Sequence, residues 1–185
     1  MTADTGNGAA APFRIPLRLE TERLLLRTFI DADWRGLHEH FSDPECTLYT
    51  FRRALTEAAT WRAMASMAGH WLLRGYGPYA AVEKSSGAVI GTVGPWYPLE
   101  WPEPEIKWAL SRRFWGTGYA SEAARAVQVM AREHLPELAL ISLIDSRNEP
   151  SIRLAQAIGA TLEREIEFAG GPFHVYRHPE NPAGI

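Results

Sequence analysis

The chain is short of cysteine, of long apolar runs and of net charge, and each shortage excludes a class of protein. Its single cysteine, Cys46, allows no internal disulfide and no multi-cysteine zinc site, in agreement with a reducing compartment. No apolar run approaches the roughly 20 residues that span a bilayer. The net charge of −3 gives no overall attraction to nucleic acid. We therefore expect a cytoplasmic protein that binds neither a membrane nor nucleic acid.

What the chain does contain is an ordinary globular composition, 46% hydrophobic and 22% charged over 185 residues. At this length one domain buries about 70% of the surface that its unfolded chain exposes. Residues 1–12 are rich in Ala, Gly and Thr and show neither the basic start nor the apolar centre of a signal peptide. We expect a flexible tail over 1–17, one domain over 18–178 and a second tail over 179–185, in a monomer or homodimer.

Six histidines raise the question of a metal site, but no carboxylate accompanies them at a known ligand spacing. If His174 and His178 share a strand, four residues at ~3.3 Å each place their rings about 13 Å apart, too far for one ion. Cys46 has no neighbouring histidine in the sequence that would activate it. We predict no metal site and an ordinary pocket or core role for Cys46.

Apolar spacing and turn residues divide the chain into alternating strands and helices. Asp31 and Asp33 are candidate N-caps of the first helix, and Gly87 marks a hairpin turn. Pro44 argues against one continuous helix between the first two helical segments. The predicted strands are 23–29, 79–83, 89–93, 105–110, 138–144, 162–168 and 173–177, and the predicted helices are 31–41, 56–73, one from about 118, and 148–159.

The segment Ser111-Arg112-Arg113-Phe114-Trp115-Gly116-Thr117-Gly118-Tyr119-Ala120-Ser121 follows a strand pattern and opens a helix pattern. Its two glycines allow a tight turn that brings main-chain N–H groups against an oxygen-rich ligand, and the helix adds its positive end. Arg112 and Arg113 are candidate phosphate partners. The segment lacks the third glycine of a Rossmann loop and the Gly-Lys-Ser/Thr ending of a P-loop. A different phosphorylated ligand is therefore indicated.

The run Arg113-Phe114-Trp115-Gly116-Thr117-Gly118 resembles the acetyl-coenzyme A loop of GNAT N-acetyltransferases. The opening run from Leu19 to Arg27, followed by Ser42-Asp43-Pro44-Glu45, is similar to the branch that contains ribosomal-protein N-terminal acetyltransferases. Glu105-Ile106-Lys107-Trp108-Ala109-Leu110 resembles the family's Glu-x-Gly-Tyr-x-Leu strand, and Asn148-Glu149-Pro150-Ser151 with Ile158-Gly159-Ala160 resembles its second coenzyme region. Lys107-Trp108 departs from the usual Gly-Tyr, on the substrate side.

The resemblance, which runs from Leu19 to Tyr176, implies the fold and the cofactor. The fold would be the α/β (α+β) GNAT acyl-CoA N-acyltransferase fold, a mixed, mostly antiparallel central sheet with helices on both faces. Two strands, 105–110 and 138–144, would diverge around the pantetheine arm of acetyl-CoA, with no metal. The residues that the resemblance places at the coenzyme are Ala109, Leu110, Arg112, Arg113, Trp115, Gly116, Thr117, Gly118, Tyr119, Ala120, Asn148 and Ser151.

The implied reaction is direct attack of a primary amine on the acetyl thioester in a ternary complex. Glu105 matches the family's acidic strand position and is the first candidate for a base acting through water, with Glu103 and Glu100 as alternatives. A main-chain N–H near Ala109 or Leu110 would stabilise the oxyanion. Ser151 or water would return a proton to the leaving thiolate.

The acceptor is a protein N-terminus, as the branch implies, or a small-molecule amine. Aromatic residues that fall in acceptor-facing segments are Tyr49, Trp96, Tyr97, Trp101 and Trp108. Lys107 would repel a cationic amine or attract an acidic one. The alternative to catalysis is a coenzyme A-binding or ligand-sequestering protein of the same fold, which would bind the coenzyme without releasing thiol.

Overall fold

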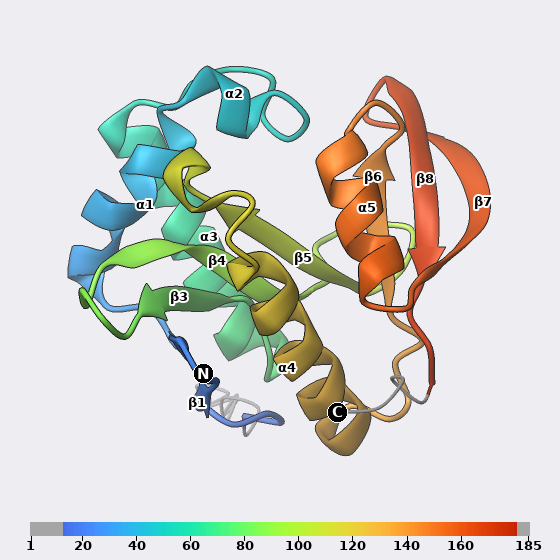
Figure 1. Cartoon of the computed structure of the whole chain (residues 1–185), viewed down its shortest axis with the longest axis horizontal. Coiled ribbons are helices and arrows are strands. Elements are labelled where there is room, and N and C mark those ends of the chain that lie inside the picture. Colours follow the sequence, from blue (N-terminus) through green and yellow to red (C-terminus); the bar gives the residue numbers. More distant parts are fainter. Residues whose placement is uncertain (1–12, 181–185) are drawn as a thin grey trace, which may run out of the picture.

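A mixed eight-stranded sheet forms the centre of the protein in the computed structural model, which describes residues 13–180 (Figure 1). Its spatial order is β1-β2-β3-β4-β5-β6-β8-β7. Neighbouring strands are antiparallel except β5 and β6, which are parallel. The strands are β1 (Arg18–Glu20), β2 (Leu24–Arg27), β3 (Tyr79–Glu83), β4 (Val89–Trp96), β5 (Glu105–Leu110), β6 (Ile141–Asp145), β7 (Thr161–Phe168) and β8 (Gly171–Arg177).

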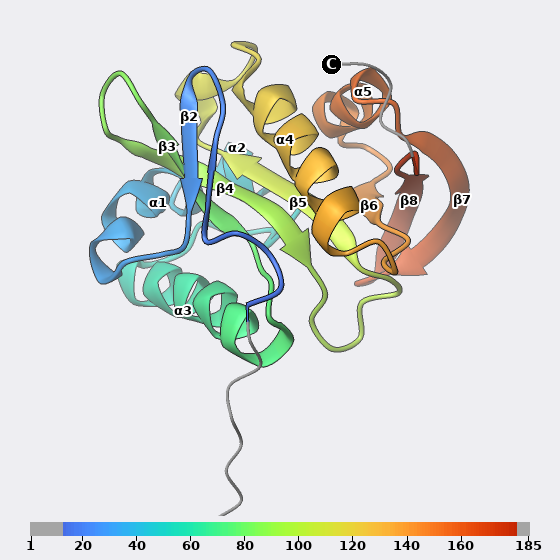
Figure 2. The same ribbon diagram turned by 90° about the horizontal axis from the view of Figure 1, so that it is seen from below.

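Helices lie on both faces of this sheet, as predicted. Figure 2 shows α1 and α3 on one face and α4 on the other. Among residues 13–180 no helix is long and apolar enough to cross a membrane. The helices are α1 (Trp34–Phe41), α2 (Pro44–Thr47), α3 (Glu57–Arg74), α4 (Tyr119–His134) and α5 (Glu149–Ala157), with short 3-10 turns η1 (Asp31–Asp33) and η2 (Arg112–Phe114).

Side-chain caps fix the starts of α2, α3 and α5. At α2 the Asp43 side chain accepts a hydrogen bond from the Glu45 N–H (2.9 Å). The Thr56 hydroxyl accepts a hydrogen bond from the Ala59 N–H at the start of α3 (3.3 Å), and Gly75 ends that helix at a φ of 76°. At α5 the predicted cap is confirmed, because the Asn148 side chain accepts from the Ser151 N–H (3.2 Å).

The predicted capping role of Asp33 is wrong. Asp33 makes no side-chain cap of α1; its carboxylate accepts from the Arg27 guanidinium (2.6 and 2.7 Å) and from the Ile30 N–H (2.8 Å). A nearby arginine on β2 is a stronger donor than a helix N–H, because its hydrogen bonds are charge-assisted. The carboxylate therefore joins β2 to the start of α1.

The beginning of the domain differs from the sequence prediction in two ways. The single opening strand is a hairpin, β1 and β2, whose register pairs Arg18 with Arg27. Residues 13–17, assigned to a flexible tail, pack against the domain: Ile15 is 3% exposed, and the Tyr79 hydroxyl donates to the Pro16 carbonyl (2.7 Å). Apolar side chains this close to the sheet gain more from burial than the short segment loses in ordering. Residues 1–12 and 181–185 of the expected tails lie outside the described residues.

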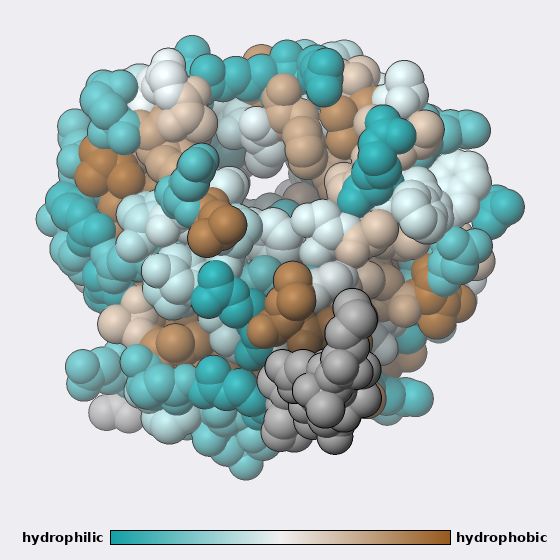
Figure 3. Space-filling view, turned by 180° about the vertical axis from the view of Figure 1, so that it is seen from behind, coloured by the Kyte–Doolittle hydropathy of each residue, from teal (hydrophilic) through white to brown (hydrophobic). Residues whose placement is uncertain are grey.

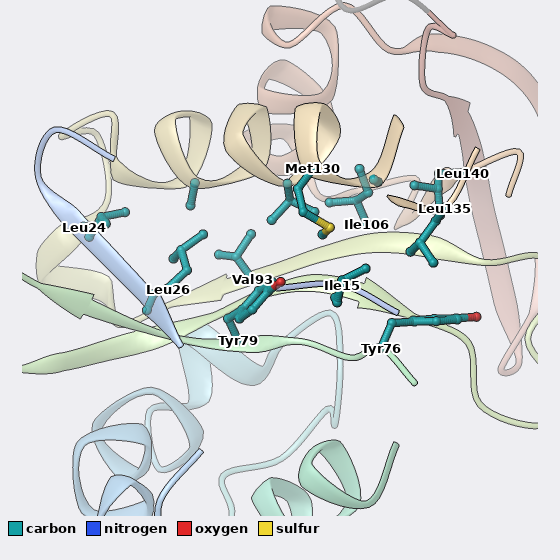
Figure 4. Close-up of a cluster of buried hydrophobic side chains, with 14 of the residues drawn as sticks. Ile15, Leu24, Leu26, Tyr76, Tyr79, Val93, Ile106, Met130, Leu135 and Leu140 are labelled. Atoms are coloured by element: carbon teal, nitrogen blue, oxygen red, sulfur yellow. The ribbon is translucent and has the colours of Figure 1, made fainter. Parts of the chain in front are cut away.

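The main hydrophobic core lies between the sheet and α4. Figure 4 shows Leu24, Leu26 and Val93 of the sheet side by side below the helix that carries Met130. The helix that the sequence predicts from about residue 118 buries a stripe of small side chains, since Ala123, Ala124, Val127 and Ala131 are all buried. Small side chains let α4 lie close to the strands, which fixes the position of its N-terminus at the end of β5.

The sheet opens between β5 and β6, as the resemblance implied. Only one residue pair, Glu105 with Ile141, is registered between these strands, and the Ser142 hydroxyl then donates to the Ile106 carbonyl (2.7 Å). Beyond that point the two strands separate (Figure 1). The strand predicted from Leu138 begins only at Ile141. The separation leaves main-chain and side-chain groups of both strands facing a gap.

Candidate active site

Two cavities meet where β5 and β6 separate. The glycine-turn cavity, about 530 Å³, is bounded by the turn at Gly116 and Gly118 and by α5. The tryptophan cavity, about 600 Å³, is bounded by Trp96 and Trp101 and by α3. Figure 3 shows the surface opened at this place. The residues that line both cavities are His40, Tyr49, Thr50, Trp108, Ala109, Asn148 and Ser151.

The glycine turn presents main-chain N–H groups to its cavity. Gly116 and Gly118 have φ of 73° and 85°, a conformation that favours glycine. Gly118 is the N-cap of the 16-residue helix α4, and it provides no side chain to cap the first N–H groups. Gly116, Gly118, Ala120 and Ser121 line the glycine-turn cavity. An uncapped helix start of this kind attracts an anion.

Ion pairs and hydrogen bonds hold the turn in place from behind. Arg23 donates to the Glu122 carboxylate (2.7 Å) and to the Thr117 carbonyl (2.9 Å), and it lies over the Tyr119 ring at 4.3 Å. The Tyr119 hydroxyl donates to Glu83 on β3 (2.6 Å). The Thr117 hydroxyl donates to the Phe114 carbonyl (2.6 Å), so the side chains of Thr117 and Tyr119, both predicted at the coenzyme, bond within the protein, and neither residue lines the cavity.

The two arginines predicted to pair with phosphate have other partners. The Arg112 guanidinium contacts the Asp43 carboxylate (2.9 Å), and that of Arg113 contacts Glu39 (2.8 Å). Neither arginine lines the glycine-turn cavity, whereas Arg153 of α5 does. The sequence could not show these ion pairs, because Asp43 and Glu39 approach the two arginines only when α1 and α2 fold over the end of β5.

Two predicted residues of α5 meet β5 at the junction of the cavities. The Ser151 hydroxyl accepts a hydrogen bond from the indole N–H of Trp108 (3.2 Å). Asn148 and Gly116 line one cavity, as expected for residues that reach the same ligand. The start of α5 is thereby tied to the strand that it faces.

The main chain of Leu110 also faces this gap. The Ser111 N–H donates to the Ile90 carbonyl of the β4 side (2.8 Å), and peptide groups alternate in direction along an antiparallel strand. Leu110 therefore points its N–H and C=O away from β4, whereas Ala109 points toward β4. The Leu110 carbonyl accepts from His40 Nδ1 (3.0 Å) and from Trp115 Nε1 (2.8 Å).

Glu105 lies in the tryptophan cavity and is 6% exposed. Its carboxylate accepts from the Trp101 indole N–H (2.9 Å) and from the Leu143 N–H (3.2 Å). Burial raises the pKa of this carboxyl group above its ordinary value, against the opposing effects of the Leu143 hydrogen bond and the Lys107 charge. A carboxylate with a raised pKa is a better base at neutral pH.

The alternative carboxylates are placed differently. Glu103 does not line either cavity; it pairs with Arg164 (2.5 Å) and Arg177 (2.6 Å), and these hydrogen bonds hold its pKa low despite burial. Glu100 is exposed in the β4–β5 loop and lines neither cavity. Side chains two residues apart on an extended strand point to the same side, which would place Glu103 with Glu105. The two prolines of this segment interrupt that alternation.

The predicted aromatic residues converge on the tryptophan cavity, with one exception. Tyr49, Trp96, Trp101 and Trp108 line it. Tyr97 does not, and it packs under the Arg74 guanidinium (5.1 Å). Among the lining residues that the sequence did not indicate are His40 of α1, and Phe168 and Phe173 of the β7–β8 hairpin. The two phenylalanines reach the cavity only because the hairpin folds back beside β6.

His40 and Cys46 are buried beside the junction. Burial lowers the pKa of His40 to about 4, so its ring is neutral at physiological pH. Burial raises the pKa of the Cys46 thiol to about 11, which makes it a poor nucleophile. The ordinary role predicted for this cysteine agrees with its place in the wall of the glycine-turn cavity.

Within residues 13–180 no group of three His, Cys, Asp or Glu side chains is placed to hold a metal ion. His174 and His178 make separate contacts: His174 approaches Glu165 (3.4 Å), and His178 contacts Gln128 and Ser142.

Residues 23–161 match the family model described as the acetyltransferase (GNAT) domain. An N-acetyltransferase of Bacillus licheniformis called p20, itself uncharacterized, is 32% identical over 158 residues, which are 83% of this chain and 89% of that protein. The solved structure of an acetyltransferase from Agrobacterium tumefaciens is 30% identical, with a TM-score of 0.79, and the match covers 89% of this chain and 95% of that one.

A solved ribosomal L7/L12 alpha-N-protein acetyltransferase in complex with coenzyme A has a TM-score of 0.69 at 16% identity, over 89% of this chain and 96% of that one. Likeness at this identity shows the fold alone. It confirms the predicted sheet and its helices, and it places the ribosomal-protein branch among the structural neighbours.

Proposed function

This chain belongs to the GNAT acetyltransferase family and is an acyltransferase, and from that premise we propose that it transfers acetyl from acetyl-CoA to a primary amine by direct attack in a ternary complex. The single observation that carries the proposal is the junction of two cavities at the separation of β5 and β6. A thioester entering from one cavity and an amine entering from the other would meet there, so that a bimolecular step becomes effectively unimolecular.

The glycine-turn cavity supports the coenzyme side of the proposal. The pyrophosphate would take the uncapped N–H groups at the start of α4, beside Gly116 and Gly118. The pantetheine arm would run between the separated strands, where Asn148 and Ser151 of α5 face Ala109 and Leu110 of β5. Arg153, rather than Arg112 or Arg113, is the arginine that lines this path.

The tryptophan cavity supports the acceptor side. The amine nitrogen must lose a proton to attack, and Glu105 is the buried carboxylate available to take it through a water molecule. Its hydrogen bonds to Trp101 and Leu143 fix its orientation. Glu103 is unsuited to this role, because two arginines hold it as a low-pKa carboxylate.

The remaining charges of the reaction arise beside β5 and α5. As the nitrogen–carbon bond forms, the carbonyl oxygen becomes an oxyanion, and the Leu110 N–H, which points into the gap, would stabilise it. The carbon–sulfur bond then breaks, and the thiolate would take a proton from Ser151 or water. Trp108 orients the Ser151 hydroxyl by donating to its oxygen.

Steady-state kinetics with both substrates varied tests this sequence of events. Transfer within a ternary complex gives intersecting double-reciprocal lines, because both substrates must be bound before product leaves. Parallel lines would indicate an acetylated enzyme intermediate and would refute the proposed direct attack.

A further inference from the structure

Acidic and basic side chains both line the tryptophan cavity, some of them in its wall and others at its rim. The carboxylates in its lining are Glu105 and Asp145, and the basic side chains are Lys107, Arg53 and Arg62. Lys107 is half-buried, whereas the two arginines are exposed at the rim. A cavity lined in this way attracts a ligand that itself carries charge.

The carboxylates already have partners within the protein. Asp145 receives the Arg147 guanidinium at 2.9 and 2.7 Å, and Glu105 receives the N–H groups of Trp101 and Leu143. The cations do not. Among residues 13–180, no carboxylate oxygen lies within 4.0 Å of the side-chain nitrogens of Lys107, Arg53 or Arg62. The cavity therefore has basic groups that form no ion pair with a carboxylate of the described residues, although the Glu105 charge acts on Lys107 from a greater distance.

The Lys107 ammonium has unusually poor protein partners. Its nitrogen lies 3.9 Å from the Met67 sulfur and 5.2 Å from the centre of the Trp96 ring. A thioether is a weak acceptor, and a ring face supplies only a modest attraction. Burial lowers the pKa of Lys107, as expected for an ammonium group without a strong acceptor.

The position of Lys107 on β5 places it beside the reacting atoms. Glu105, Lys107 and Ala109 alternate onto one face of the strand and all line the tryptophan cavity. Successive residues on one face lie about 7 Å apart. Lys107 therefore lies between Glu105, the proposed base, and Ala109, which lines both cavities.

We propose, on the basis of the acetyl transfer inferred above, that the acceptor is a zwitterionic amine, an α-amino acid with an apolar side chain. Its carboxylate binds the Lys107 ammonium, with the rim arginines adding to the attraction. Its side chain lies among Trp96, Trp101 and Phe168, and its amine faces the water that Glu105 activates. Cationic amines without a carboxylate, such as polyamines and aminoglycosides, are poor acceptors because Lys107 repels them.

Three acceptors of matched shape test the proposal by thiol release from acetyl-CoA. L-phenylalanine has the carboxylate, L-phenylalaninamide replaces it with a neutral group of the same shape, and phenethylamine lacks it. We expect kcat/KM for phenylalanine to exceed that of both others at least tenfold, as one charge-assisted interaction contributes a factor of about ten or more. Equal or better use of either analogue without the carboxylate would overturn the proposal.

Substitutions of the chain's two lysines, Lys107 and Lys84, provide a matched pair. Lys107→Met should lower kcat/KM for phenylalanine about tenfold, mainly through KM, and should not lower the rate with phenylalaninamide, which Lys107 no longer repels. Lys84→Met should change neither rate, because Lys84 lies in the turn between β3 and β4 and pairs with Glu20. Unchanged coenzyme A affinity shows that the variant is folded. Preference for the carboxylate that survives Lys107→Met would contradict the assignment.

A protein N-terminus with an acidic residue close to it also offers an amine beside a carboxylate. C-terminally amidated peptides that differ only in Asp or Asn at the second position distinguish this source from a free amino acid. We expect both peptides to be poorer acceptors than phenylalanine, and a strong preference for the Asp peptide alone would overturn the amino acid as acceptor.

A binding measurement distinguishes failure of this inference from failure of the acetyl transfer on which it rests. Phenylalanine is titrated into the coenzyme A-saturated protein while tryptophan fluorescence is followed. If no amine releases thiol, the transferase proposal fails, but saturable binding that Lys107→Met abolishes would still support a carboxylate site. Absence of binding to the unsubstituted protein would overturn the inference itself.

Discussion

Burial of Glu105 between β5 and β6 does two things at once at the scale of a single residue. It raises the pKa of the carboxyl group, and the N–H groups of Trp101 and Leu143 hold both oxygens in a fixed direction. The sequence selected this residue through its resemblance to an acidic strand position. The pKa could not be predicted, because it depends on β6, whose distance from β5 is set by the fold.

Glu105→Gln should lower kcat by a factor of about 10² or more with little change in coenzyme A affinity, because it removes the base and keeps the shape of the side chain. Thiol release measures kcat, and calorimetry measures the affinity. The matched control is Glu100→Gln, in the exposed loop before β5, which should leave kcat unchanged. An unchanged kcat in Glu105→Gln would remove this residue from the mechanism.

The same carboxyl group predicts a pH dependence. A base works only when deprotonated, so kcat should fall as pH drops through a pKa above the ordinary carboxyl value of about 4.3. That fall should be absent from the residual activity of Glu105→Gln. A pH profile with the same acidic limb in both proteins would assign the limb to another group.

Gly118→Val should weaken acetyl-CoA binding, because Gly118 has a φ of 85° and a β-branched residue would distort the turn that presents its N–H groups. An added Cβ would also lie 3.3 Å from the Arg23 guanidinium that supports the turn. Isothermal titration calorimetry measures the loss. Gly87→Val, with a φ of 71° in the β3–β4 turn, imposes similar strain elsewhere and should keep the affinity. Equal affinity in both variants would reject the phosphate turn.

At the scale of elements, Asp33 joins strand β2 to helix α1. Its carboxylate is 3% exposed and holds both guanidinium nitrogens of Arg27. Asp33→Ala should lower the free energy of unfolding by about 3 kcal/mol, because it leaves a partly buried arginine without its partner. Urea unfolding measures the change. Asp31→Ala, which removes an exposed hydrogen bond from Trp61, should cost about 0.5 kcal/mol or less. Equal losses would refute the structural role of Asp33.

The sequence predicts individual elements of this chain better than their contacts. The helix beginning at Tyr119 and the strand Glu105–Leu110 are found where apolar spacing and glycine positions put them. The β1–β2 hairpin is missed, because only three residues form β1. The expected phosphate arginines, Arg112 and Arg113, illustrate the limit: their charges satisfy carboxylates of α1 and the segment before α2, which come near only in the folded chain.

At the scale of the whole molecule, three buried histidines, His40, His70 and His178, connect stability to pH. Burial lowers the pKa values of His40 and His178 from 6.5 to about 4. Gln128 donates to His178 Nδ1, which requires the neutral ring. Between pH 6.5 and 4 the unfolded state binds more protons at these sites, so stability falls as pH falls. Each shift corresponds to on the order of 3 kcal/mol when fully expressed.

We therefore expect the urea midpoint to decrease as pH falls from 7 to 4.5, and the decrease to be smaller in His178→Gln, which cannot take up the proton. The raised pKa of Glu105 acts in the opposite direction over part of this range, but it is one site against three buried histidines, since burial lowers the pKa of His70 as well. A midpoint that is constant or rises toward acid pH would show that these histidines are not held neutral in the folded protein.

The arrangement of the whole domain produces the site. The sheet separates between β5 and β6, α4 and α5 direct their N-termini at one side of the gap, and α3 with the β7–β8 hairpin encloses the other. Neither cavity belongs to one element, so each depends on tertiary packing. Direct transfer between two ligands that meet in the gap is the central claim.

The most direct test is to measure free thiol and acetylated amine together after acetyl-CoA is mixed with the protein, with and without an amine. We expect release only when an acceptor is present, with one acetylated amine formed for each thiol. Coenzyme binding without thiol release for amino acids, N-terminal peptides and polyamines alike would contradict it and would leave a coenzyme-binding protein in place of a transferase.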